Sequence, residues 1–196
     1  MTIFYLKEKF ELLDSGKFGL SETPEKLGLI GWDAKNPRLA LWVKLLQKHQ
    51  NKHFVVINTH LDHIGENARQ NGEVLLVNKI REIAGNFPIL LCGDFNSNTD
   101  SQTYRTIIEN GFIDCSNNPV VINYDQPYTY HRYILGSKQE DIDKFKDDKR
   151  VLKIIDHIFY NGSIKVLRHG ILADNYAGIY PSDHFPKLCD VILEDY

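Results

Sequence analysis

The sequence has few cysteines, no excess of basic residues and no long apolar run. Its three cysteines, Cys92, Cys115 and Cys189, are far apart and form no CxxC pair, so neither a zinc site nor a disulfide framework is indicated. No apolar run approaches the ~18 residues that a transmembrane helix needs. The opening residues lack the charged and apolar regions of a signal peptide. We therefore expect reduced thiols, no membrane span and a cytoplasmic protein, although a signal in an N-terminus missing from this chain would leave no trace here.

The charge balance also excludes one class of surface. The 196 residues carry 23 basic and 26 acidic side chains, for a net charge of −3. Tight, non-specific binding of a polyanion would need a basic excess. Nucleic acid stays open as a substrate, because a bound cation can supply local positive charge. The length suits one domain over residues 1–196.

Hydrophobic patterns predict more strands than helices. Helices are expected at 65–84 and 101–110, each stopped by a glycine. Strands are expected at 3–6, 10–20 (with a turn at 14–16), 38–47, 53–59, 88–92, 151–160, 163–169 and 187–193. Alternating charges predict an exposed loop or frayed helix at 137–150. Helices between strands in the middle of the chain favour a mixed α/β (α+β type) sandwich over a doubly wound parallel sheet.

Several predicted strands end in acid, amide or imidazole groups. These are the segments NTHLDH at 58–63, GDFN at 93–96, DH at 156–157 and SDHFP at 182–186. Each has an ordinary structural explanation when taken alone: GDFN can form an Asx-turn, and a single histidine belongs more often to a loop than to a site. Together they can converge at one rim of a sheet, where a rigid scaffold holds a site.

These side chains supply the parts needed to hydrolyse a phosphodiester. Such a reaction needs a hard cation, a base that activates water and a donor near the phosphate oxygens. Carboxylates and amides are the ligands of Mg²⁺, and an imidazole oriented by a carboxylate is a common acid or base. Zinc is less favoured, because the ligands are rich in oxygen and no HExxH is present. Mg²⁺ is therefore the expected cofactor, with Mn²⁺ as the alternative.

The four motifs, in this order, resemble the endonuclease/exonuclease/phosphatase superfamily. The segments 10–25 and 31–45 also resemble the part that precedes the THLDH strand in small bacterial members, so the resemblance covers nearly the whole chain. It implies a four-layer β-sandwich flanked by helices. It further implies a metal-dependent hydrolase that cleaves phosphodiester or phosphomonoester bonds, with a phosphate ester as its substrate and nucleic acid among the candidates.

The resemblance also implies a role for each matching residue. His60 and His184 match the two catalytic histidines, and Asp156 matches the carboxylate that orients the second. Asp94 matches the aspartate that activates or orients water, and the resemblance does not decide whether Asp94 or His184 takes the proton. Asn96 matches an amide at the phosphate.

Further positions match less directly. Asp183 matches a metal-associated aspartate, and Asp94 is the other expected metal ligand. Arg38 aligns with a basic residue near the substrate, although a strand-edge arginine explains it equally well. Residues 128–131 lie where family members often have a substrate loop.

The chain also departs from the family pattern at its N-terminus. Family members begin with a strand that carries an asparagine, and a later strand ends in a metal-binding glutamate. Neither strand is found here, and Glu22 follows the wrong segment to replace that glutamate. We therefore expect a fold that is incomplete at its N-terminus, weakened Mg²⁺ binding and low activity of the chain alone. A missing segment or a partner chain would complete the enzyme. The alternative is an inactive, truncated or non-catalytic descendant that binds a phosphorylated ligand or a protein.

Overall fold

Two β-sheets and two α-helices form the described part of the chain. The computed structural model describes residues 1–117, 122–124, 126–135, 143–145 and 147–195. A six-stranded sheet has the order β1-β2-β3-β4-β7-β5, and a three-stranded sheet has the order β6-β8-β9. The strands of the larger sheet are β1 (Phe10–Gly19), β2 (Leu39–Gln47), β3 (Lys52–His60), β4 (Ile89–Asp94), β5 (Ile113–Asp114) and β7 (Asp156–Asn161). Those of the smaller sheet are β6 (Ile122–Tyr124), β8 (Ile164–Ile171) and β9 (Lys187–Leu193).

The middle of the chain forms the one parallel pairing found among the described strands of the larger sheet. Strands β1, β2 and β3 pair antiparallel, and α1 (Glu66–Ala84) then carries the chain over to β4, which runs parallel to β3. Strand β7 returns antiparallel to β4. Because β3 and β4 end at the same edge and β7 begins there, one edge of the sheet gathers the residues that follow β3 and β4 and precede β7.

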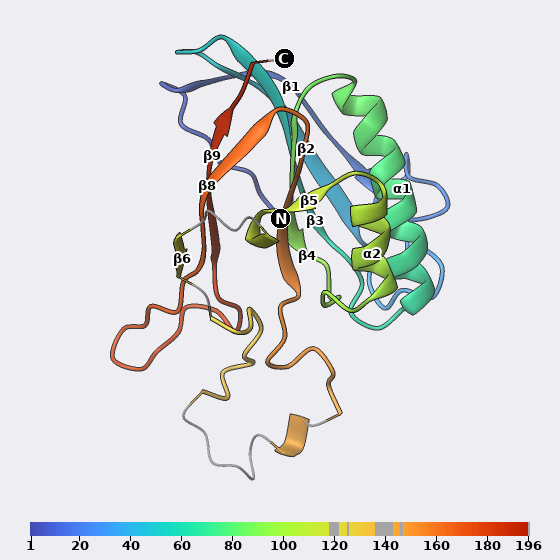
Figure 1. The fold of residues 1–196 in the computed structure, drawn as a ribbon. Helices are drawn as coiled ribbons and strands as arrows, with labels where there is room; N and C mark the ends of the chain where they lie inside the picture. Colours follow the sequence, from blue (N-terminus) through green and yellow to red (C-terminus); the bar gives the residue numbers. More distant parts are fainter. Residues whose placement is uncertain (118–121, 125, 136–142, 146, 196) are drawn as a thin grey trace.

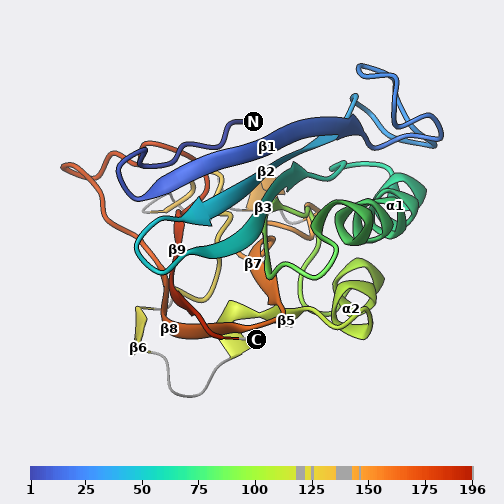
Figure 2. The ribbon, with the colours of Figure 1, turned by 90° about the horizontal axis from the view of Figure 1, so that it is seen from above.

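The apolar core lies on both faces of the larger sheet. On one face, α1 and α2 (Gln102–Glu109) lie side by side over residues such as Ile57, Leu91 and Phe159 (Figures 1 and 2). On the other face, Val43 and Phe54 pack in one cluster with residues of β8 and β9. The α/β sandwich is confirmed, with helices flanking the larger sheet. Within the described ranges no α-helix covers the outer face of the smaller sheet.

The predicted helices agree with the structure to within one residue. Gly65 is the N-cap of α1 and Gly85 is its C-cap, while the Ser101 side chain caps α2 by accepting a hydrogen bond from the backbone N–H of Tyr104 at 3.0 Å. Neither helix, in the part of the chain described, has the length and apolar character needed to cross a membrane. The strands at β2, β3, β4, β8 and β9 are likewise confirmed.

Other predicted elements were wrong, for local reasons. Residues 3–6 form no strand, because Ile3 and Tyr5 pack on the sheet without pairing. The expected turn at 14–16 is absent, because these residues pair regularly with β2; a β-bulge lies just before them, where the pairing shifts between Leu12 and Asp14. Residues 151–155 precede β7 and do not belong to it. The short strands β5 and β6 were missed, since two or three residues carry no periodic signal. Of the predicted charged loop, residues 137–142 and 146 lie outside the described residues.

Candidate active site

Three polar side chains form a row across adjacent strands at one edge of the larger sheet. His60 ends β3, Asp94 ends β4 and Asp156 begins β7. The pairing puts His60 opposite Asp94 and Asp94 opposite Asp156. Directly paired residues send their side chains to the same face of a sheet. The backbone register alone therefore brings these three side chains together.

The end of β4 depends on a glycine. Gly93 has φ +148°, and a Cβ atom at this position would lie 2.0 Å from the carbonyl oxygen of Thr59 in β3. Only a residue without a side chain allows this approach. Just beyond, Asn96 has φ +47° and its backbone N–H donates to Oδ1 of Asp94 at 2.8 Å. The Asx-turn considered from the sequence is therefore present, and it helps to fix the Asp94 carboxylate.

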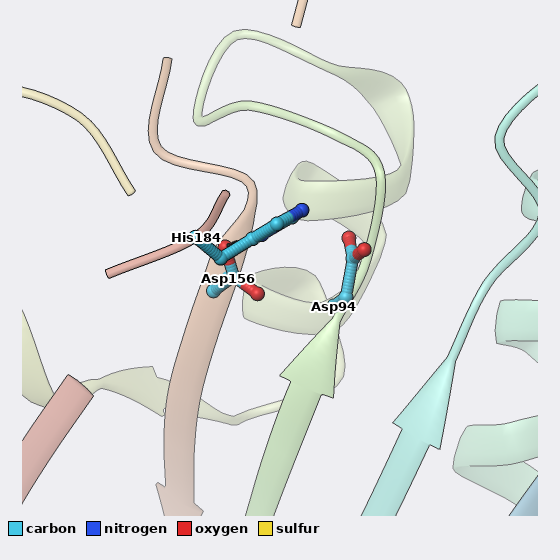
Figure 3. Close-up of side chains that lie close together, drawn as sticks. All are labelled: Asp94, Asp156 and His184. Atoms are coloured by element: carbon cyan, nitrogen blue, oxygen red, sulfur yellow. Dashed lines mark hydrogen bonds and ion pairs between the residues drawn. The ribbon is translucent and has the colours of Figure 1, made fainter. Parts of the chain in front are cut away.

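His184 reaches the same place from the loop before β9. Its Nδ1 lies 2.8 Å from Oδ2 of Asp156, and its ring centroid lies 4.7 Å from that of Tyr130. Figure 3 shows the imidazole extending from above Asp156 toward Asp94 at the end of β4. The donor atoms of Asp94, Asp156 and His184 all lie within 4.8 Å of one another. Such a cluster could hold a metal ion.

Burial and neighbouring charges separate the pKa values in this group. Burial, with the nearby Asp156 carboxylate, raises the pKa of Asp94 to about 6. Burial, with the positive charge of Arg38, lowers the pKa of His60 to about 4, so this imidazole is neutral at pH 7. Although burial opposes it, the hydrogen bond to Asp156 raises the pKa of His184. His184 is thus the histidine that is set to carry a positive charge.

The donor set fits a hard divalent cation. Two carboxylates on paired positions repel each other, which adds to the effect of burial in raising the pKa of Asp94. A cation between them would offset that repulsion. Asp183 lines the same cavity as Asp94, but it is not among the three residues whose donor atoms cluster. Its backbone carbonyl accepts hydrogen bonds from the N–H groups of His131 and Arg132. A metal-binding role for Asp183 stays a prediction.

Arg38 is held at the site by a carboxylate that the sequence reasoning left without a role. Its Nε donates to Oδ1 of Asp62 at 3.2 Å, and its Nη2 lies 2.9 Å from Nδ1 of His63. Asp62 also accepts backbone N–H bonds from Lys35, Asn36, Ile64 and Gly65, and these bonds lower its pKa although burial opposes the shift. Asp62 therefore holds in place both the turn that precedes α1 and the side chain of Arg38.

Arg150 is the most prominent site residue that the sequence did not reveal. Its Nη1 donates to Oδ1 of Asn96 at 2.7 Å. Its Nε and Nη2 donate to the two oxygens of Asp148, both at 2.8 Å. The Nδ2 of Asn96 donates in turn to the carbonyl of Leu61, so both ends of this amide are bonded to the protein. Within a charge-rich segment, no sequence signal distinguishes Arg150 from its exposed neighbours.

One open cavity of about 590 Å³ unites most of these groups. Six of the seven predicted site residues line it: Arg38, His60, Asp94, Asn96, Asp183 and His184. Tyr130, from the predicted substrate loop, also lines it. Asp156, which is hydrogen-bonded to His184, lines an adjoining cavity together with Asp94 and His184. By contrast, His157, next to Asp156 in the sequence, is buried and paired with Asp114 at 3.1 Å, which makes it a structural histidine.

Comparison with known families decides the class of protein. The model of the Endonuclease/Exonuclease/phosphatase family matches residues 4–184. The chain belongs to this family. Members of the family hydrolyse phosphodiester or phosphomonoester bonds, usually with a metal ion. The four sequence motifs therefore identified the family correctly.

Solved family structures resemble the chain over nearly its full length. An endonuclease/exonuclease/phosphatase from Bacteroides vulgatus is 34% identical with a TM-score of 0.81, and the match covers 97% of this chain and 69% of that one. A mannosyl-6-phosphatase from Bacteroides thetaiotaomicron is 32% identical with a TM-score of 0.81, covering 96% of this chain and 69% of that one. Nocturnin of Drosophila melanogaster is 24% identical over 217 residues, which span 98% of this chain and 32% of Nocturnin.

Proposed function

We propose that this family member is a phosphate-ester hydrolase that uses Mg²⁺, with Mn²⁺ as a possible substitute. The observation that carries the proposal is the cluster of Asp94, Asp156 and His184, placed beside His60 in one open cavity. Asp94 and Asp156 are the oxygen donors that would hold the cation. When bound, it would neutralise charge that develops on the phosphate oxygens.

The side chains of the chain itself then divide the proton chemistry. Asp94, a carboxylate that is ionised at pH 7, accepts the proton of the attacking water. His184, whose positive form is stabilised by Asp156, donates a hydrogen bond or a proton on the phosphate side. His60, neutral at pH 7, lies 3.2 Å from Asp94 and contacts the scissile phosphate. Arg38 supplies a fixed positive charge at the same cavity.

Both ester types remain within this proposal. The mannosyl-6-phosphatase, at 32% identity, is named for a phosphomonoester activity, which supports testing monoesters as well as diesters. The cavity has no strong positive excess, since its three arginines are paired with carboxylates: Arg38 with Asp62, and both Arg132 and Arg150 with Asp148. This balance does not favour a long polyanion as the substrate.

The test is metal-dependent hydrolysis by the wild-type protein and by two variants. Hydrolysis of 4-nitrophenyl phosphate and of bis(4-nitrophenyl) phosphate is measured with Mg²⁺, with Mn²⁺ and after chelation. We expect His184→Ala to lower kcat/KM by about 10²–10⁴-fold and to keep the wild-type circular dichroism spectrum. His53→Ala, a half-buried histidine on β3 stacked on Phe87 away from the cavity, is the matched control.

The alternative is a non-catalytic descendant that only binds a phosphorylated ligand. It predicts phosphate binding by calorimetry without turnover under any metal condition. Turnover that survives chelation, or that His184→Ala leaves unchanged, would contradict the proposed mechanism.

A further inference from the structure

A second cavity adjoins the catalytic cavity and shares four residues with it. This side cavity has a volume of about 610 Å³ and lies between the first turns of α1 and α2 and the segment 147–150. Its shared wall with the catalytic cavity consists of His63, Asn96, Arg150 and Ile155. A phosphate held near Asp94 and His184 can therefore carry a substituent that extends past Asn96 into the side cavity.

The charges that line the side cavity are balanced. Three cations and three carboxylates are found there: Arg69, Lys149, Arg150, Glu66, Asp147 and Asp148. The charge of Arg150 is already offset, because its Nε and Nη2 donate to the two carboxyl oxygens of Asp148. Burial lowers the pKa of His63, so this imidazole favours its neutral form. A second phosphate would need a net positive site, so the lining fits a neutral group better than an anion.

The other lining side chains are polar but not aromatic. Apart from the imidazole of His63, no ring faces the cavity among the described residues, and Ile64 and Ile155 are its only large apolar groups. Bases of nucleotides are usually held by stacking on aromatic side chains, and acyl chains need apolar walls. Amides and hydroxyls instead line this cavity, and they both donate and accept hydrogen bonds. The chemistry therefore suits a group with several hydroxyls.

Two glutamines are the best placed to bind such a group. Among the described residues, the side chains of Gln70 on α1 and Gln102 on α2 make only long contacts within their own helices. Gln70 donates to Glu66 at 3.3 Å, and Gln102 donates to Thr106 and accepts from Arg105, both at 3.4 Å. By contrast, Asn98 accepts the backbone N–H of Asp100 and Ser101 caps α2. We propose that the side cavity binds the carbohydrate or polyol part of a phosphate ester, with Gln70 and Gln102 as specificity residues. This inference rests on the proposed hydrolase function.

The experiment compares two leaving groups on the same enzyme. With Mg²⁺ bound, kcat/KM is measured for glucose 6-phosphate and for 4-nitrophenyl phosphate, whose leaving group has a ring and no further hydroxyl. We expect Gln70→Ala and Gln102→Ala each to lower the ratio of kcat/KM for glucose 6-phosphate to kcat/KM for 4-nitrophenyl phosphate. The decrease should be about threefold to tenfold, which corresponds to one lost hydrogen bond. Asn78→Ala, an exposed amide on α1 outside the cavity, should leave the ratio unchanged.

A binding measurement separates this inference from the proposed function. Titration calorimetry with glucose 6-phosphate and with inorganic phosphate measures the contribution of the side cavity to binding affinity, even when no turnover is seen. Tighter binding of the sugar phosphate, weakened by Gln70→Ala and Gln102→Ala, supports the inference whether or not the protein hydrolyses it. An unchanged ratio in both variants, or equal affinities for the two ligands, overturns the inference and leaves the metal-dependent hydrolysis standing.

Discussion

A buried carboxyl group between the two helices gives a prediction with a calculable magnitude. Glu73 lies on the inner face of α1 with no exposed surface, and neither of its carboxyl oxygens has a hydrogen-bond partner among the described residues. Burial, with the charge of Glu109 on α2, raises its pKa from 4.5 to about 9. The folded protein therefore holds a proton that the unfolded chain loses above pH 4.5, so the free energy of unfolding falls as pH rises through this window.

The size of this effect follows from the two pKa values. A full difference of one proton changes the free energy of unfolding by about 1.4 kcal/mol per pH unit. Between pH 5 and pH 7 the stability should therefore fall by up to about 3 kcal/mol, and the decrease should continue toward pH 9. Glu73→Gln cannot ionise and should abolish this slope, so the variant should be more stable than the wild type at pH 8.

Urea denaturation at a series of pH values measures the slope. Trp32 packs beside Gly72, which lies on α1 next to Glu73. Its fluorescence can therefore report on unfolding at α1. Glu82→Gln is the matched control, because Glu82 lies on α1 with its side chain 66% exposed, and we expect it to keep the wild-type slope. If Glu73→Gln shows the same pH dependence as the wild type, the carboxyl group is already ionised in the fold and the reasoning is wrong.

Three further predictions concern the site. The affinity for Mg²⁺, measured by calorimetry, should fall as the pH falls below about 6, because a proton then competes with the metal ion for Asp94. A constant affinity from pH 5 to 7.5 would exclude Asp94 as a ligand. Arg150→Ala should lower kcat/KM by about tenfold or more, since it frees the Asn96 amide, whereas Lys165→Ala, an exposed position on β8 outside both cavities, should have little effect. Gly93→Ala should destabilise the fold by about 3 kcal/mol or more in thermal unfolding, because its methyl group meets the Thr59 carbonyl. Gly28→Ala is the control for backbone strain alone and should cost less, because Gly28 also has a positive φ, +83°, but its added methyl group would meet no atom within 4 Å.

The sequence predicted the site residues on strands better than those on loops. His60 and Asp94 follow short apolar runs, so their positions at strand ends could be predicted from the pattern. Asp156 was expected inside a strand, but it begins one, because residues 151–155 are used in another way: the Lys153 carbonyl accepts the N–H groups of Thr129 and Tyr130. Pairings between distant loops of this kind leave no periodic signal.

The missed residues share a physical reason. Arg150 and Asp148 lie in a segment dense in both charges, where a solvated loop is the ordinary expectation. Arg150 is important because it contacts Asn96, which is 54 residues away in the chain, and Asp148 because it holds Arg150. Asp62 had been noted only as part of a motif, although its four backbone N–H bonds make it a structural centre. Such roles arise from tertiary contacts and not from local propensity.

The alignment of His60, Asp94 and Asp156 on neighbouring strands has a consequence for how this protein can change. These three groups are tied to the ladder of backbone hydrogen bonds, and a one-residue insertion in β4 would turn Asp94 to the opposite side of the sheet. His184, Tyr130 and Arg150 instead arrive on connecting segments. Substrate preference can therefore vary through the lengths and sequences of those segments, while the reacting carboxylates keep their places.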